Sequence, residues 1–294
     1  MITAVAHPIA AKSRVWLETL EELERRGVVL KTEVSRHAGH SRELAARLAG
    51  QSELMLVLGG DGTIHEVLNG LFDQPGPRPA LCLVPVGTGN DLCRALDVRL
   101  EKDRLVQTVL EGVRRRMDLG RLTCDGGTVF FGCTCSAGFA AEVARRTDEL
   151  ASKSKLRGLS YSVALFLCLT GFKSPRAHFT IDGKEHRAPL LFNLNLCNTR
   201  YYGGGMTAAP KADPFDGELD MVSMELNRLQ VLQALPRNYS GNFDGIAGVV
   251  QQRVRRLRLE TDPPVLVQAD GQIVGRSPLE VEVVPAALEL VLPP

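Results

Sequence analysis

Two short apolar runs, each followed at once by a glycine-rich turn, constrain the fold of this 294-residue chain more than any other feature. The runs lie at residues 54–58 and 80–84, and neither contains a charged residue. A strand that is apolar at every position is typical of a parallel sheet that helices cover on both faces. Both runs therefore predict buried strands in the middle of an α/β layer.

The rest of the first 119 residues continues the alternation of strands and helices. The other predicted strands are residues 2–6 and 28–34, and the predicted helices are residues 13–26 and 41–48. Strands and helices that alternate in this way indicate a parallel sheet between two helical layers. Residues 1–119 are therefore predicted to form a three-layer α/β domain.

From about residue 120 the pattern becomes that of an antiparallel β domain. Turn signals such as Asp125-Gly126-Gly127 and Asp182-Gly183 separate many of the strand-like runs. Two helical stretches interrupt them, at residues 140–149 and 160–171. We predict a mainly antiparallel β-sandwich over residues 120–284, with residues 285–294 as a strand that returns to the first domain. The predicted strands are residues 128–133, 178–182, 190–196, 219–224, 254–260, 265–269 and 279–284.

Composition narrows the class of protein. Apolar residues make up 44% and charged residues 23% of the chain, and the net charge of +1 gives no reason to expect a nucleic-acid partner. The seven cysteines are an odd number without repeated spacing, so neither a disulfide framework nor a zinc site is predicted. The sequence shows no signal-peptide pattern and no apolar stretch of the ~20 residues that a membrane span needs. We therefore expect a cytoplasmic protein.

The first glycine-rich turn has the chemistry of a phosphate site. It joins the run at residues 54–58 to a predicted helix that begins near residue 64. Glycines let a ligand approach the backbone, and the helix that follows offers free N–H groups to an anion. A carboxylate at the end of a strand can also hold Mg²⁺ beside phosphate oxygens. A plain turn with a helix-capping aspartate is the alternative interpretation of Gly59, Gly60, Asp61, Gly62 and Thr63.

A second turn repeats this arrangement after residues 80–84. It leads through small residues into a short predicted helix at residues 92–96. Thr88 could donate to a phosphate, and Asn90 could contact phosphate or ribose. Neither turn has the lysine that follows the glycines of a Walker A loop, and neither fits the dinucleotide fingerprint. The second turn consists of Gly87, Thr88, Gly89, Asn90 and Asp91.

Taken in order, the two turns resemble the diacylglycerol kinase catalytic-domain family, which includes bacterial lipid kinases and the sphingosine and ceramide kinases. NAD kinases and phosphofructokinases share the first turn but not the second at this spacing. The resemblance continues through most of the chain, over residues 135–139, 198–206, 209–220 and 268–272. It implies an ATP- and Mg²⁺-dependent kinase with a nucleotide-binding first domain and a lipid-substrate second domain.

The resemblance also assigns roles near the nucleotide. Asp61 would sit at the nucleotide–Mg²⁺ centre, residues 59–63 would line the triphosphate, and Thr88 would touch the nucleotide. Ser35 falls where relatives place a nucleotide-touching threonine. The family's first strand ends in Asn-Pro, whereas this chain has His7-Pro8, so one family contact is altered.

Two further positions are assigned in the second domain. The turn at residues 213–218 resembles a structural Mg²⁺ site, with Asp216 giving its carboxylate and Asp213 and Glu218 giving mainly backbone oxygens. The segment at residues 268–272 resembles the family's Asp-Gly-Glu motif, which holds the proton acceptor. Gln272 stands where relatives have the glutamate and cannot take a proton as a carboxylate does, so Asp270 is the remaining candidate base.

We therefore expect a kinase that phosphorylates a hydroxyl of diacylglycerol or a related lipid at the inner membrane face, with a homodimer suggested by the bacterial relatives. The apolar helix near residues 161–172 is a natural place for acyl chains, although a core helix is the favoured interpretation. Lys153, Lys155 and Arg157 could meet anionic headgroups. Two alternatives stay open: a catalytically weakened regulator that binds nucleotide or lipid, and a kinase of a soluble acceptor such as NAD.

Overall fold

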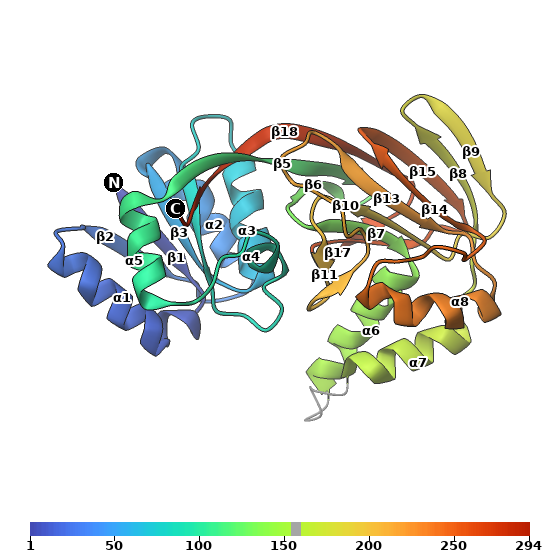
Figure 1. The fold of residues 1–294 in the computed structure, drawn as a ribbon, viewed down its shortest axis with the longest axis horizontal. Coiled ribbons are helices and arrows are strands. Elements are labelled where there is room, and N and C mark those ends of the chain that lie inside the picture. The colour runs from blue at the N-terminus through green and yellow to red at the C-terminus, as the bar shows by residue number, and fades with distance from the viewer. Residues whose placement is uncertain (154–159) are drawn as a thin grey trace. The chain divides into compact units, whose positions relative to one another are not determined.

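The computed structural model describes residues 1–153 and 160–294, and it divides into two compact units (Figure 1). Each unit has a hydrophobic core of its own. The chain contributes to unit 1 three times, because a short glycine segment and the last ten residues join the N-terminal part. Unit 1 comprises Met1–Leu119, Gly203–Gly205 and Pro285–Pro294, and unit 2 comprises Gly120–Tyr202 and Met206–Val284.

Unit 1 is built on a parallel sheet with the strand order β2-β1-β3-β4. Residues 54–59 and 80–85 are buried at every position, as their apolar sequence predicts. The end of β18 joins the sheet beside β4, where Leu290 pairs with Leu81 in parallel. The strands are β1 (Ile2–Ala6), β2 (Leu30–Val34), β3 (Leu54–Gly59), β4 (Ala80–Pro85) and β18 (Leu279–Leu292).

Helices form layers on both sides of this sheet. Trp16 of α1 and Leu105 of α5 pack in one core with alternate residues of β3 and β4, so these two helices share a face. Helices α2 and α3 pack against each other and contact β1 and β3. The first helix begins where the Ser13 hydroxyl accepts from the Trp16 amide, at 3.3 Å. The helices are α1 (Arg14–Arg25), α2 (His40–Leu48), α3 (Asp61–Phe72), α4 (Asp91–Ala95) and α5 (Lys102–Glu111).

Unit 2 is a sandwich of antiparallel sheets. One layer contains the first part of β18 beside β15, β8 and β9, together with β5 and β6. The other has the strand order β14-β13-β10-β7-β16-β17. Their inner faces meet in a core that includes Phe131, Phe179 and Leu257. The predicted fold class, a three-layer α/β domain followed by an antiparallel β-sandwich, is confirmed.

Within the described residues, the second unit contains most of the strands and three α-helices, together with a 3-10 helix at Leu235–Tyr239. The α-helices are α6 (Phe139–Lys153), α7 (Ser160–Gly171) and α8 (Arg228–Ala234). Its strands, apart from β18, are β5 (Val113–Cys124), β6 (Gly127–Phe131), β7 (Thr134–Gly138), β8 (Arg176–Ile181), β9 (Lys184–Ala188), β10 (Asn193–Cys197), β11 (Tyr201–Tyr202), β12 (Met206–Thr207), β13 (Leu219–Met224), β14 (Val249–Val254), β15 (Arg256–Asp262), β16 (Leu266–Ala269) and β17 (Gln272–Arg276).

One predicted strand is divided between the two sheets of the sandwich. Residues 254–260 were expected to form a single strand, but β14 ends at Val254 and β15 begins at Arg256. The Asp182 carboxylate accepts from the amides of Arg255 and Arg256, at 3.1 and 2.8 Å. This contact from a distant turn holds the backbone where the chain changes sheets.

Candidate active site

A cavity of about 560 Å³ opens in unit 1 at the carboxyl ends of its parallel strands. His7 follows β1, Ser35 follows β2, Gly60 follows β3 and Val86 follows β4. Ligands of open α/β sheets bind at this edge, because the loops after neighbouring strands converge there. The full lining is His7, Pro8, Ile9, Ser35, Arg36, His37, Ala38, Ser41, Gly60, Gly62, Thr63, Glu66, Val86 and Gly87.

The structure brings five of the sequence-predicted residues together in this lining: His7, Ser35, Gly60, Gly62 and Thr63. The four predicted parallel strands end within one residue of the observed ends, which explains why these side chains meet, whereas α3 begins three residues earlier than predicted. The other predicted nucleotide contacts are Gly59, Asp61, Thr88 and Asn90. They are not part of the lining, and their positions give them different contacts.

The first glycine turn is compact because α3 starts directly at the end of β3. Gly60 is the residue before the helix, and its carbonyl accepts from the amides of Thr63 and Ile64 at 3.0 and 3.1 Å. A Cβ at Gly59 would overlap the Thr63 side chain, so glycine is needed at this position. The arrangement turns the N-terminus of a three-turn helix toward the cavity, where it can bind an anion.

The two glycine turns touch each other through their backbones. The Val86 amide donates to the Gly59 carbonyl at 3.0 Å, and a Cβ at Gly87 would overlap the Cα of Gly60. Asn90 closes the second turn on itself, since its Oδ1 accepts from the Gly87 amide at 2.9 Å and its Nδ2 donates to the Gly87 carbonyl at 2.8 Å. Asn90 thus shapes the turn, while Thr88 lies exposed on it.

Asp61 connects the first turn to the start of α4. Its Oδ1 accepts from the Asp91 amide at 2.7 Å, and a Cβ at Gly89 would lie 2.7 Å from its Oδ2. Asp91 in turn accepts from the Gly204 amide at 2.8 Å, which ties the glycine segment at residues 203–205 into unit 1. Oxygen donors of this kind suit Mg²⁺, which proteins usually bind through one or two carboxylates together with substrate phosphates.

Several lining residues were missed in the sequence. Arg36 and His37 line the cavity directly after Ser35, and the carboxyl end of β2 was the signal that could have included them. Glu66 replaces a local cap for α2, because its two oxygens accept from the amides of Gly39 and Ser41 at 2.8 and 3.2 Å. No sequence pattern indicates this contact, since the residues lie more than twenty positions apart.

In unit 2, the Asp270 carboxylate is surrounded by backbone amides. Its Oδ2 accepts from Gly132 at 2.9 Å, and its Oδ1 accepts from Cys133 at 2.8 Å and from Thr134 at 3.1 Å. The residue itself has a positive φ of 48° in the turn between β16 and β17. Asp270 therefore holds the segment between β6 and β7 in place, a structural task that its sequence motif does not reveal. Gln272, two residues later, is exposed at the start of β17.

Two carboxylates of the predicted magnesium turn in unit 2 form ion pairs with arginines. Arg253 lies 3.2 Å from Asp216 and 3.4 Å from Glu218, and Arg255 lies 3.4 Å from the other oxygen of Glu218. Asp213 accepts from the Phe215 amide at 3.1 Å. A divalent ion would have to displace a guanidinium, so these donors do not fit Mg²⁺ in this arrangement. The ion at this turn stays a prediction.

Comparison with known proteins gives the family. The diacylglycerol kinase catalytic domain matches residues 4–122, and the YegS C-terminal NAD kinase beta sandwich-like domain matches residues 133–292. The chain belongs to the diacylglycerol kinase catalytic-domain family. The resemblance inferred from the two glycine turns is confirmed, and so is the assignment to the lipid-kinase class of enzymes.

Individual relatives extend over nearly the whole chain. A diacylglycerol kinase of Mycobacterium tuberculosis is 29% identical over 300 residues, covering 99% of this chain and 95% of the relative. The crystal structure of a diacylglycerol kinase from Bacillus anthracis has a TM-score of 0.75 at 18% identity, over 100% and 97% of the two chains. An NAD kinase from Archaeoglobus fulgidus in complex with ATP has a TM-score of 0.55 at 16% identity, over 99% and 93%. The last two show the fold.

Proposed function

We propose that this lipid kinase transfers the γ-phosphoryl group of ATP, with Mg²⁺, to a hydroxyl of diacylglycerol or a closely related lipid. The cavity at the carboxyl ends of β1 to β4 is the observation that carries the proposal. It combines a helix N-terminus with two glycine turns in backbone contact. Phosphoryl transfer depends mainly on such positioning and on charge compensation, because the transition state is loose.

In unit 1, the residues around the cavity bind and orient the nucleotide. The N-terminus of α3 holds phosphate oxygens, and Arg36 and His37, which line the same cavity, add donors. Gly87 keeps the second turn close enough to Gly60 for both backbones to face one phosphate chain. Asp61 would hold Mg²⁺, which offsets the negative charge of the phosphates when it is bound.

In unit 2, Asp270 provides the one carboxylate of the acceptor motif. Its two oxygens already accept three backbone hydrogen bonds, so we assign it to orienting the lipid hydroxyl and not to taking its proton. Base assistance is commonly worth ~10²–10⁴-fold, and Gln272 cannot replace a carboxylate in that role. This set of contacts favours a second candidate, a slow or catalytically weakened member of the family that binds nucleotide and lipid.

We further propose that α7 contacts the membrane surface that holds the lipid. Ala164 and Cys168 are buried against the core of unit 2, whereas Val163, Phe166 and Leu167 are exposed, Phe166 by 68%. Among the described residues, no helix is long and apolar enough to span a bilayer. Lys155 and Arg157 lie outside the described residues, as does the side chain of Lys153. The lipid specificity and the homodimer remain proposals.

The decisive experiment measures transfer of label from ATP to lipids in mixed micelles with Mg²⁺. The acceptor panel contains diacylglycerol, monoacylglycerol, sphingosine, ceramide and phosphatidylglycerol, with NAD as the soluble alternative. Asp61→Asn is the matched control, because its amide oxygen can still accept from the Asp91 amide while the charge is lost. We expect one lipid to be labelled and kcat to fall by about 10²-fold or more in the variant.

Two other outcomes would contradict the proposal. Labelled NAD without labelled lipid would make the protein a kinase of a soluble acceptor. ATP binding with no labelled product, in the wild type and in Asp61→Asn alike, would support the weakened regulator. An Asp61→Ala variant with a lower melting temperature than Asp61→Asn separates the loss of the Asp91 contact from the loss of charge.

A further inference from the structure

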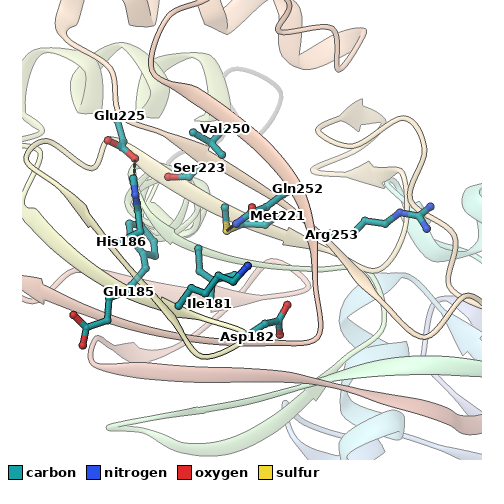
Figure 2. A pocket seen from close by; sticks show the side chains of 12 residues that line it. Ile181, Asp182, Glu185, His186, Met221, Ser223, Glu225, Val250, Gln252 and Arg253 are labelled. Carbon is teal, nitrogen blue, oxygen red and sulfur yellow. Dashed lines mark hydrogen bonds and ion pairs between the residues drawn. The ribbon is translucent and has the colours of Figure 1, made fainter.

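Unit 2 contains a cavity of about 360 Å³ between the inner faces of two outer pairs of antiparallel strands (Figure 2). One pair is the hairpin β8–β9, in which Phe179 pairs with His186 and Ile181 pairs with Lys184. The other pair is β13–β14, whose strands are joined through α8, and in which Met221 pairs with Gln252 and Ser223 with Val250. Because side chains alternate along a strand, each set projects from one face of its sheet. All eight residues line the cavity.

The floor of this cavity is apolar except for one hydroxyl group. Phe179 and Met221 are 1% and 2% exposed and belong to the core of unit 2. Ser223 is also only 2% exposed, and its Oγ has no hydrogen-bond partner among the described residues. A buried hydroxyl without a partner costs about 1–3 kcal/mol, so natural cores seldom keep one without a reason. A ligand that bonds to Ser223 would supply that reason.

The mouth of the cavity is polar and carries charges of both signs, because Asp182, Glu185 and Glu225 line it together with Lys184, His186 and Arg253. The three carboxylates have partners in the protein, whereas Lys184 has no salt bridge among the described residues. Lys184 and His186 lie on β9, at the edge of their sheet, and Gln252 lies on the facing edge strand β14. His186 Nε2 lies 2.9 Å from an oxygen of Glu225, which links the two strand pairs on the side of Ser223 (Figure 2). Lys184, His186 and Gln252 are exposed, so the cavity has a polar rim around the buried Ser223.

We propose that this cavity binds a small amphipathic carboxylate that carries a hydroxyl group. Its apolar part lies on Phe179, Ile181 and Met221, its hydroxyl bonds to Ser223, and its carboxylate faces Lys184. At about 30 Å³ for each water-sized group, the volume holds about a dozen heavy atoms. None of the residues assigned to nucleotide, Mg²⁺ or acceptor lines the cavity, so the site is additional to the proposed kinase function.

Methionine-methyl NMR tests the proposal at the cavity floor, independently of kinase turnover. The protein, with its six methionines ¹³C-methyl-labelled, is titrated with 3-hydroxydecanoate and with decanoate, both below their micelle concentrations. The Met221 signal is assigned with Met221→Leu. We expect 3-hydroxydecanoate to shift this signal and to bind about three- to tenfold more tightly than decanoate, the worth of one hydrogen bond.

Ser223→Ala and Val250→Trp complete the design. Ser223→Ala should remove the preference for 3-hydroxydecanoate while retaining binding of decanoate. Val250→Trp should block the binding of both acids, because the larger side chain fills the mouth of the cavity. Decyltrimethylammonium, which has the chain without the carboxylate, should leave the Met221 signal unchanged. No shift with either acid at millimolar concentration, or a preference that persists in Ser223→Ala, would overturn the proposal. Melting temperatures of the variants confirm that each is folded.

Discussion

The two units differ in what surrounds their motif residues. Around the cavity of unit 1, the glycine turns are held by their own backbone, by Asn90 and by Asp61, and side chains such as Ser35 and Arg36 line the cavity. In unit 2, the carboxylates that the motifs single out are engaged by protein groups: Asp270 by three amides and Asp216 by Arg253. A motif thus marks a structural joint in both units, and in unit 1 several of its residues also line a cavity.

The largest expected effect is at that joint in unit 2. Asp270→Ala would leave the amides of Gly132, Cys133 and Thr134 without their acceptor, and unsatisfied amides cost about 1–3 kcal/mol each. We expect a loss of roughly 3 kcal/mol in the free energy of unfolding, measured by urea denaturation. Asp270→Asn retains one acceptor oxygen and should lose less. Equal stability of the alanine variant and the wild type would restore Asp270 as a residue with a purely catalytic task.

A smaller effect is expected where the two glycine turns of unit 1 meet. In Gly87→Ala, the new methyl group overlaps the Cα of Gly60 and separates the turns. Overpacking of this kind costs about 1–3 kcal/mol, and we expect it to appear chiefly as weaker ATP binding by isothermal titration calorimetry. Gly50→Ala is the control, because a Cβ there has nothing within 4 Å. Unchanged ATP affinity in Gly87→Ala would show that the contact between the turns does not shape the nucleotide site.

The arginine at the predicted magnesium turn should have an effect of less than about 1 kcal/mol, since half of the Arg253 side chain is exposed. The Arg253→Met variant is informative because its melting temperature should respond to added Mg²⁺. We expect EDTA to leave the melting temperature of the wild type unchanged, and Mg²⁺ to raise that of Arg253→Met, in which Asp216 loses its cation and Glu218 keeps only Arg255. Arg258→Met, which alters an exposed pair elsewhere, is the control. A wild type that EDTA destabilises would establish a metal ion at this turn.

The smallest expected effect is a difference in the labelling rates of two thiols. It compares how strongly the two units protect a cysteine from solvent. Burial raises the pKa of the Cys82 thiol in unit 1 to about 12, and it also raises the pKa of the half-buried Cys124 in unit 2. Because the thiolate reacts, a raised pKa means slow labelling at pH 8, with faster labelling as the pH increases. Iodoacetamide should modify Cys124 first, as shown by mass spectrometry. Prior labelling of Cys82 would mean that unit 1 opens more readily than unit 2.

The sequence was sufficient where structure is local. The strand, turn and helix at residues 54–72 are consecutive, so their pattern predicted all three elements, although the helix begins at Asp61 and not near residue 64. The same holds for Ser35 and His7, which simply follow the ends of their strands. The amphipathic helix α5 at residues 102–111 was not predicted. Its start lacks a side-chain cap, so no capping signal precedes it.

Contacts between residues that lie far apart in the sequence could not be predicted. Nothing near Asp182 indicates that it holds the backbone at Arg255, and nothing near Glu66 indicates that it caps α2. The same is true of Asp270 and the segment it holds, which lie more than 130 residues apart. The chemistry of each carboxylate could be predicted from sequence, but its partner is chosen by the fold.

The long strand β18 belongs to both units, so it determines the order in which the two units can be completed during synthesis. Unit 2 ends at Val284, so all of its residues exist once that position has left the ribosome. Unit 1, whose first 119 residues are made much earlier, still lacks the strand beside β4 until residues 285–294 emerge. Although domains usually fold from the N-terminal end during synthesis, here the later unit can be complete first. Until residues 285–294 have been made, the edge of β4 in unit 1 therefore stays uncovered.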